Sequence, residues 1–146
     1  MPDMKIDLDD VRRKVDLIDF RMIKLLNERM EYVMRIRRLK EDITDQKREQ
    51  IVIGNIQKHS QGLVRPGFSE RLFNEIISES KRIQQEGLKS IGFQGEHGAY
   101  GDVAALKFDK TIVPLPCRTF ADVFDEVGIG LVDFGMMAVL SLRDRE

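Results

Sequence analysis

Apolar residues recur at alternating steps of three and four along the first forty residues of the chain. This spacing places them on one face of an α-helix, and its persistence over many turns is typical of a long helix that packs against other helices. The apolar positions of this seam are Leu8, Val11, Val15, Ile18, Met22, Leu25, Tyr32, Ile36 and Leu39. We therefore expect one unbroken helix from about Ile6 to Glu41, with the seam buried.

A charged residue, Arg29, occupies the seam position between Leu25 and Tyr32. A guanidinium stays charged at all physiological pH values, and burying it without a partner costs several kcal/mol. A structural ion pair with a carboxylate on a neighbouring helix is the commoner explanation for such a residue. The alternative is that Arg29 binds an anionic ligand, and the polar residues of the next two helices favour it.

Helix geometry separates the basic residues that could share an anion with Arg29. On an ideal helix Lys40 lies on the same face as Arg29 and ~16 Å further along the axis, whereas Arg12 lies ~25 Å away in the other direction. Arg12 could reach such a site only from a second copy of the chain that runs antiparallel. A helix of ~50 Å also exceeds the ~30 Å diameter of a domain of ~90 residues. We therefore predict a homodimer in which Arg12 crosses the interface.

Two further helices are expected after a short connection. The second is predicted over residues 45–60, with Thr44 or Asp45 as its N-terminal cap. Residues 61–67 contain two glycines and a proline and are predicted to form a loop. The third helix is predicted to begin at residue 68 or 69 and to end at about residue 86.

Polar residues interrupt the predicted core of these two helices. Ser80 and Gln84 are four residues apart and share one face of the third helix, whereas Arg48 and Glu49 are adjacent and point in different directions. Each pair alone is more often structural. With Arg29 they supply cations, a hydroxyl and an amide, without a nucleophile or a metal-binding cluster. Such a set suits an anionic substrate that is bound and oriented without covalent attack.

The pattern changes after Gly87. Short strands are predicted over residues 90–93, 111–115 and 131–139, and they alternate with helices predicted over residues 102–108 and 119–127. This alternation is typical of a parallel α/β sheet. A segment this short is expected to bury its sheet poorly. The predicted fold is therefore mainly α, with a three-helix domain over residues 1–87 and an incomplete α/β fragment over residues 88–146.

Composition narrows the class of protein. Of the 146 residues 34% are charged, and the formal net charge of −1 favours neither nucleic acid nor a membrane as a partner. A basic group near the end of the long helix (Arg35, Arg37, Arg38 and Lys40) is expected to be solvated, as such groups usually are. One cysteine, Cys117, without a partner or metal spacing, suits a reducing cytoplasm. Because the sequence shows neither a signal peptide nor an apolar run long enough to span a membrane, we expect a cytoplasmic protein. We expect no metal and no cofactor.

The polar residues stand in motifs that resemble a known family. The first ninety residues resemble the all-α class of chorismate mutase, as fused in front of prephenate dehydratase in bifunctional enzymes. The motifs are Arg12 in VRRKVDLID, Arg29 in LLNERM, Lys40, the DQKRE stretch and IISESKRIQQ. The resemblance implies an intertwined homodimer with two sites, each of which takes Arg12 from the partner chain. It also implies the rearrangement of chorismate to prephenate, in phenylalanine and tyrosine biosynthesis.

The resemblance further implies a role for each residue. Arg12, Arg29 and Arg48 would bind the two carboxylates of chorismate, and Ser80 would assist at a carboxylate. Lys40 and Gln84 would hydrogen-bond the ether oxygen, and Glu49 with Asp45 would hold the ring hydroxyl. The residues expected to be catalytic are Arg29, Lys40, Glu49 and Gln84, and those expected to bind substrate are Arg12, Asp45, Arg48 and Ser80. The connection between Lys40 and Asp45 is shorter than is usual in the family.

The last third of the chain resembles the start of a prephenate dehydratase domain. The resemblance rests on IGFQGEHGAYGDVAAL, FADVF and VDFGMMAV. Ala99 and Gly101 stand where serines are common, and the Glu-Asn-Ser continuation and the Thr-Arg-Phe motif are absent. We therefore expect a truncated dehydratase start without dehydratase activity. A phosphate-binding loop is a rival interpretation of the glycines, but the chain lacks a Gly-Lys-Ser/Thr sequence.

Two alternatives to a mutase remain. An isochorismate-pyruvate lyase uses a similar helical scaffold and a similarly anionic substrate. A non-catalytic helical dimerisation module would keep the same charges as structural ion pairs.

Overall fold

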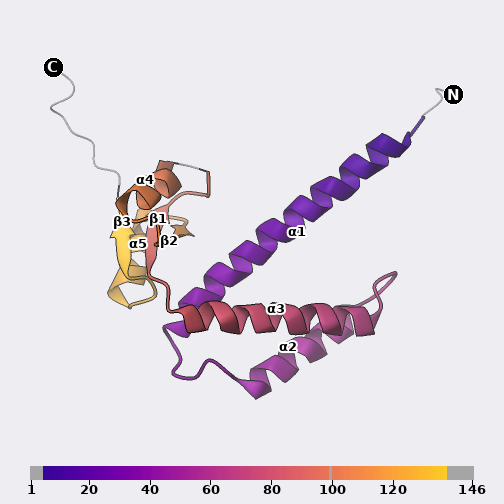
Figure 1. Ribbon diagram of the computed structural model, residues 1–146, viewed down its shortest axis with the longest axis horizontal. Helices are drawn as coiled ribbons and strands as arrows, with labels where there is room; N and C mark the ends of the chain where they lie inside the picture. The colour runs from indigo at the N-terminus through magenta and orange to yellow at the C-terminus, as the bar shows by residue number, and fades with distance from the viewer. Residues whose placement is uncertain (1–4, 99, 138–146) are drawn as a thin grey trace.

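The computed structural model describes residues 5–98 and 100–137 of the chain (Figure 1). Three helices are followed by a small unit in which strands and helices alternate, so the predicted mainly α fold with a short α/β part is confirmed. The elements are α1 (Leu8–Arg37), α2 (Gln46–His59), α3 (Pro66–Glu86), β1 (Ser90–Gln94), α4 (Tyr100–Phe108), β2 (Val113–Cys117), α5 (Phe120–Gly128) and β3 (Phe134–Met136).

Helix α1 is the long helix that the apolar pattern predicts, but it ends earlier than expected. Asp7 caps its N-terminus. At the other end the Arg37 guanidinium donates hydrogen bonds to the backbone carbonyls of Lys40 and Glu41, which holds the chain in a turn. Lys40 therefore belongs to the connection after α1. The prediction that Lys40 continues the helical face of Arg29 is wrong.

Most of α1 extends away from the rest of the molecule (Figure 1). Its apolar seam is open in this region, because Leu8 is 63% exposed, Ile18 53% and Leu25 64%. Within α1 the buried residues are Val33 and Arg35, both near its C-terminal end. The seam that the sequence predicts to be buried is therefore uncovered in the single chain.

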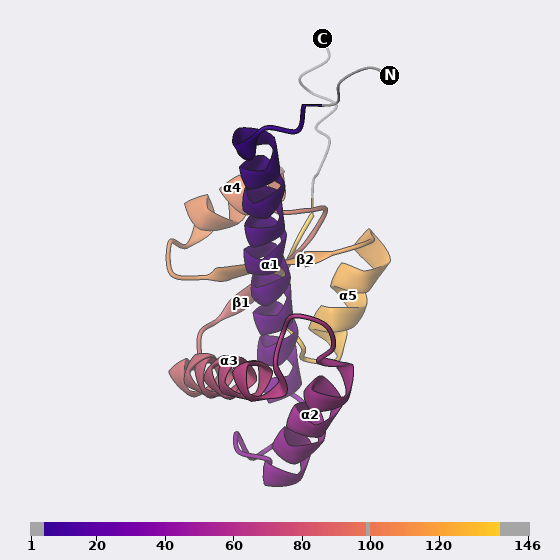
Figure 2. The same ribbon diagram turned by 90° about the vertical axis from the view of Figure 1, so that its right-hand side faces the viewer.

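Helices α2 and α3 pack against each other, and α3 also packs against the C-terminal end of α1 (Figures 1 and 2). The side chain of Asp45 caps α2, as predicted, by accepting a hydrogen bond from the backbone N–H of Arg48 at 3.0 Å. Helix α3 begins at Pro66, slightly earlier than predicted, since proline is well suited to the first position of a helix. It ends at Gly87, whose φ of 62° is a left-handed conformation that favours glycine.

The α/β part is built on a parallel sheet in the order β2-β1-β3, which confirms the predicted strand direction. Helices α4 and α5 cover opposite faces of it. Gly101 of α4 lies against Phe93, and any Cβ at position 101 would collide with that ring. On the other face a Cβ at Gly135 would lie 2.9 Å from Val123 of α5. Strand β3 is shorter than the predicted 131–139, of which residues 138 and 139 lie outside the described part.

The centre of this unit is well buried, although its outer surfaces are not. Phe93 is 1% exposed and Leu115 is fully buried, whereas Phe124 on α5 is 62% exposed. The expectation of poor burial therefore applies to the outside of the sheet and its helices and not to the central strand.

Polar contacts from Glu31 and Arg35 of α1 and from Arg38, its C-terminal cap, join this helix to the α/β part. The Arg35 guanidinium forms an ion pair with Glu126 of α5 at 3.1 Å and donates a hydrogen bond to the carbonyl of Pro116 at 3.0 Å. Arg38 pairs with Asp133 at 2.5 Å, and Glu31 of α1 pairs with His97. Arg35 is only 7% exposed. The expectation that this basic group is solvated is therefore wrong for Arg35, and Arg38 is also engaged.

None of the helices in the described ranges 5–98 and 100–137 is long and apolar enough to span a membrane.

Candidate active site

A cavity of about 270 Å³ lies between the C-terminal part of α1, the connection that follows it, α2 and α3. Seven of the eight predicted site residues line it, namely Arg29, Lys40, Asp45, Arg48, Glu49, Ser80 and Gln84. The remaining lining residues are Tyr32, Val33, Ile36, Ile43, Val52, Ile77 and Lys81. Residues from four separate segments, selected only because they interrupt apolar stripes or match motifs, thus come together around one space.

Arg29 faces this cavity without a carboxylate partner in the described part of the chain. Its Nη1 donates a hydrogen bond to Ser80 Oγ at 2.8 Å, and that hydroxyl donates to the backbone carbonyl of Ile76 at 2.8 Å. Burial and the positive charge of Arg48 both lower the pKa of Arg29. A structural ion pair therefore does not explain Arg29. Two neighbouring guanidinium groups without a counter-ion favour an anion between them.

The two acidic residues of the cavity are held differently from each other. Asp45 uses one carboxylate oxygen to cap α2, as described above. Glu49 forms an ion pair with Lys81 of α3 at 2.5 Å. Sequence reasoning missed Lys81. The signal was available, because Lys81 follows Ser80 at the margin of the apolar stripe of α3 and lies four residues after Ile77.

Lys40 and Gln84 reach the cavity while bonded to backbone carbonyls. Lys40 Nζ donates to the carbonyl of Ile43 at 3.0 Å, and Gln84 Nε2 donates to the carbonyl of Val33 at 3.0 Å. An ammonium has three N–H donors and a primary amide has two, so both groups keep donors for a ligand. Lys40 lines the cavity with the other predicted residues, although it belongs to the connection after α1 and not to α1 itself.

Arg12 lies outside this cavity. It is exposed on the extended part of α1, where its guanidinium is 3.9 Å from Asp9. Seventeen residues of helix separate it from Arg29, a distance of ~25 Å along the axis. The single chain therefore leaves one predicted site residue unassembled.

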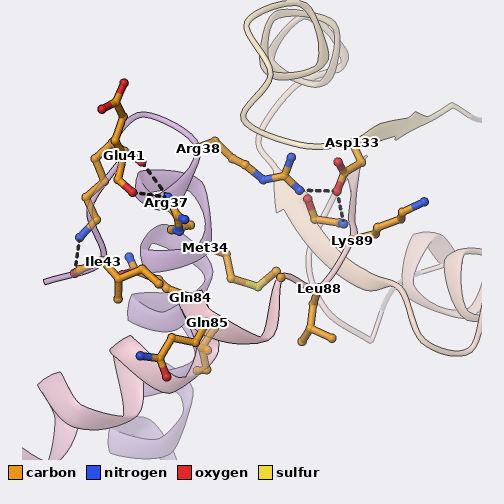
Figure 3. Close-up of a pocket in the computed structure, with 14 residues that line it drawn as sticks. Met34, Arg37, Arg38, Glu41, Ile43, Gln84, Gln85, Leu88, Lys89 and Asp133 are labelled. Atoms are coloured by element: carbon orange, nitrogen blue, oxygen red, sulfur yellow. Dashed lines mark hydrogen bonds and ion pairs between the residues drawn. The ribbon is translucent and has the colours of Figure 1, made fainter.

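A larger cavity of about 830 Å³ lies where α3 leads into the α/β part (Figure 3). It shares Lys40, Ile43 and Gln84 with the first cavity. Figure 3 shows Arg38 directed at Asp133, and it shows Arg37 bonded within its own connection. Because Arg37 and Arg38 are already engaged, these two guanidinium groups are less available to an anion than Arg29 and Arg48 of the smaller cavity. The smaller cavity is therefore the candidate active site.

The described residues include one cysteine, Cys117, which lies outside both cavities. Burial and the neighbouring Glu126 raise the pKa of the Cys117 thiol to about 11, so it is almost entirely protonated near neutral pH. In residues 5–98 and 100–137 no group of three or more His, Cys, Asp or Glu side chains is placed to hold a metal ion. The polar groups that line the smaller cavity are charged groups, amides and hydroxyls, which can bind a ligand by charge and hydrogen bonding.

Comparison with known proteins assigns the helical part of the chain to a family. Residues 11–85, which contain all eight predicted site residues, match the family described as chorismate mutase type II. The chain belongs to this family. Residues 91–141 match the prephenate dehydratase family.

The relatives of this chorismate mutase family member include bifunctional chorismate mutase/prephenate dehydratases. That of Pseudomonas aeruginosa is 28% identical over 142 residues, which cover 90% of this chain and 38% of the relative. That of Neisseria gonorrhoeae is 29% identical over 126 residues, covering 84% and 34%. That of Escherichia coli K12 is 24% identical over 152 residues, covering 88% and 39%. The chain thus spans less than two fifths of the length of these curated relatives. No solved structure matches it.

Proposed function

We propose that this chain is an isomerase that converts chorismate to prephenate in the cavity between α1, α2 and α3. The observation that carries the proposal is the pair Arg29 and Arg48, which line the cavity without a carboxylate partner in the described part of the chain. Chorismate carries two carboxylates, an ether oxygen and a ring hydroxyl. The family match over residues 11–85 supports the same reaction.

The proposed roles follow the groups that line the cavity. Arg29 and Arg48 bind substrate carboxylates, and Ser80 supports Arg29 through their 2.8 Å hydrogen bond. Lys40 and Gln84 donate to the ether oxygen. Asp45 and Glu49 accept from the ring hydroxyl.

The reaction needs no group transfer to the protein. Within one substrate molecule the ether C–O bond breaks while a new C–C bond forms, so the atoms of the product are those of the substrate. Negative charge develops on the ether oxygen as the bond breaks, and the cation of Lys40 with the amide of Gln84 stabilises it. Holding the two carboxylates selects the compact conformer in which the reacting carbons are close.

Each site is proposed to be completed by Arg12 from a second copy of the chain. The exposed seam of α1 supports this arrangement, because Leu8, Ile18 and Leu25 are each more than half exposed in the single chain. An antiparallel partner helix would cover them. It would also bring its Arg12 toward the Arg29 of the first chain.

Two incubations test the proposal. The purified chain is mixed with chorismate and, separately, with isochorismate, and the products are followed by absorbance and chromatography. Prephenate from chorismate is the expected result. Salicylate and pyruvate from isochorismate would favour the lyase, and no reaction with either compound would favour a non-catalytic dimerisation module. We also propose residues 1–87 as the mutase domain, because all eight proposed site residues lie before the α/β part.

A further inference from the structure

The candidate active site contains one cation, Lys81, that has no role in the proposed binding of chorismate. Lys81 projects from α3 and lines the same cavity as Arg29 and Arg48. Its Nζ lies 2.5 Å from Glu49 Oε1 on α2, and the two side chains are 29% and 28% exposed. The pair is therefore partly shielded from water, inside the wall of the cavity.

We propose that Lys81 is a positioning residue that holds the Glu49 carboxylate away from the arginines that bind substrate. This inference rests on the proposed function of the cavity. Its lining carries four cations, Arg29, Lys40, Arg48 and Lys81, against the two acids Asp45 and Glu49. Pairing between Lys81 and Glu49 leaves both guanidinium groups available to the two carboxylates of chorismate. Without Lys81, the Glu49 carboxylate, which lines the same cavity, would be free to compete for them.

The ion pair between Lys81 and Glu49 matters because an acidic and a basic residue line the same cavity. Arg48 and Glu49 are neighbours at the start of α2, and both line the cavity. A free glutamate that lines the same cavity as two substrate-binding arginines can pair with one of them and block the carboxylate site. An ion pair to a different helix fixes the direction of Glu49 and prevents this.

A purely structural role for Lys81 makes a different prediction. If the ion pair only ties α2 to α3, its loss changes thermal stability and leaves the affinity for substrate unchanged. If Lys81 restrains Glu49, its loss weakens substrate binding, and the effect requires the Glu49 carboxylate.

The test compares the wild type with Lys81→Met, Lys81→Arg, Glu49→Gln and the double variant Lys81→Met/Glu49→Gln. Lys58→Met is the matched control, because Lys58 is an exposed lysine near the end of α2 and lines neither cavity. The readouts are KM and kcat with chorismate, the affinity for prephenate by isothermal titration calorimetry, and Tm by circular dichroism. The calorimetric readout serves any variant that no longer turns over substrate.

We expect Lys81→Met to raise KM and to weaken prephenate binding by about tenfold, the size of one lost charge-assisted contact, with a smaller change in kcat. Lys81→Arg restores most of the affinity, and Lys58→Met matches the wild type. In the Glu49→Gln background the Lys81 substitution adds no further loss, because no carboxylate remains to compete.

Two results would overturn the inference. One is a Lys81→Met protein with wild-type KM and prephenate affinity. The other is an equal loss of affinity with and without the Glu49 carboxylate. A wild-type protein that neither converts chorismate nor binds prephenate would instead refute the proposed function, so the two failures are distinguishable.

Discussion

At the scale of single residues, two arginines of α1 differ in their partners. Arg29 has no carboxylate partner among the described residues, whereas Arg35 is paired with one. Arg29 lies where the sequence predicts a buried charge, yet it pairs with no carboxylate in the described residues and donates to a hydroxyl. Arg35 lies where a solvated charge is expected, yet it is buried and paired with Glu126. An arginine without a counter-ion is available to a ligand, whereas a buried pair holds two parts of the chain together.

Replacing Arg29 with methionine tests the first of these roles. We expect kcat/KM for chorismate to fall by a hundredfold or more, which corresponds to roughly 3 kcal/mol of lost transition-state stabilisation. The free energy of unfolding should stay near the wild-type value or rise, because repulsion from Arg48 is relieved. Steady-state kinetics and urea unfolding measure the two quantities. Arg71→Met, an exposed substitution on α3, is the control. If the Arg29 variant is instead partly unfolded, and its activity falls in proportion to the fraction of folded protein, Arg29 has a structural role.

Replacing Arg35 with methionine should give the opposite result. The Glu126 carboxylate, 20% exposed, loses its cation, and the carbonyl of Pro116 loses a hydrogen bond. We expect the free energy of unfolding to fall by about 3 kcal/mol, as for other buried pairs from which one partner is removed. The additional substitution Glu126→Gln should recover part of this loss. Urea unfolding followed by circular dichroism measures both, and an unchanged midpoint for Arg35→Met would contradict the assignment.

At the scale of elements, the C-terminal end of α1 serves two structures at once. One side of it contributes Arg29 and Val33 to the candidate active site, and another contributes Glu31, Arg35 and Arg38 to the α/β part. The periodic apolar pattern describes only the first of these contacts. The second depends on charged residues that a helical pattern leaves on the solvent side.

The contact between Glu31 and His97 makes the attachment of the α/β part sensitive to pH. Burial lowers the pKa of His97, but hydrogen bonds and charges from Glu31 and Asp102 raise it by more, so its net shift is upward. A raised pKa means that this contact stabilises the fold fully below the unfolded pKa of about 6.5. Its contribution is lost as the pH rises through the higher pKa of the folded state.

We therefore expect urea unfolding of the wild type to show a stability component that declines as the pH is raised above about 6.5. His97→Gln should remove this component and leave the rest of the pH dependence. His59→Gln is the control, because His59 bonds only to Asn55 of its own helix among the described residues. Equal pH dependence in the wild type and His97→Gln would show that the contact contributes nothing.

At the scale of the whole molecule, the single chain has two features that the proposed second copy would account for together. The apolar seam of α1 is exposed from Leu8 to Leu25, and the predicted site residue Arg12 lies far from the cavity that should need it. An antiparallel dimer would cover the seam and complete two equivalent sites.

Mixing two inactive variants tests this assembly. Arg12→Met and Arg29→Met should each lose most activity alone. After subunit exchange, each heterodimer has one site with both lesions and one with neither, and so about half of the activity of a wild-type dimer. Kinetics before and after exchange, with sedimentation to confirm the dimer, measure the effect. A mixture that regains nothing, or a fully active monomer, would contradict the shared site.

The sequence by itself determined what local rules control. Helix periods, caps and turns depend on neighbouring residues, so the order of all eight elements, the Asp45 cap and the parallel strands could be predicted. Arg29, Ser80 and Gln84 could be proposed as site residues because a polar residue in an apolar stripe, at a helical spacing, must face a polar partner or a ligand. The motif resemblance added Asp45, Arg48, Glu49 and Lys40 to the proposed set, and the helical placement of Lys40 was predicted wrongly.

Only the tertiary structure decided which charges meet across the fold. Arg35 and Glu126 are 91 residues apart, and Lys81 and Glu49 belong to different helices. No local pattern relates the members of either pair. From the sequence alone, an arginine or lysine outside an apolar stripe is predicted to be solvated, and only the fold shows that a carboxylate lies beside it. The end of α1 at Arg37 was missed for a different reason, because the bonds from its guanidinium to the carbonyls of Lys40 and Glu41 are local but do not follow from the apolar periodicity. Long-range electrostatic contacts depend on the packing of the elements, whereas the elements themselves follow from local periodicity.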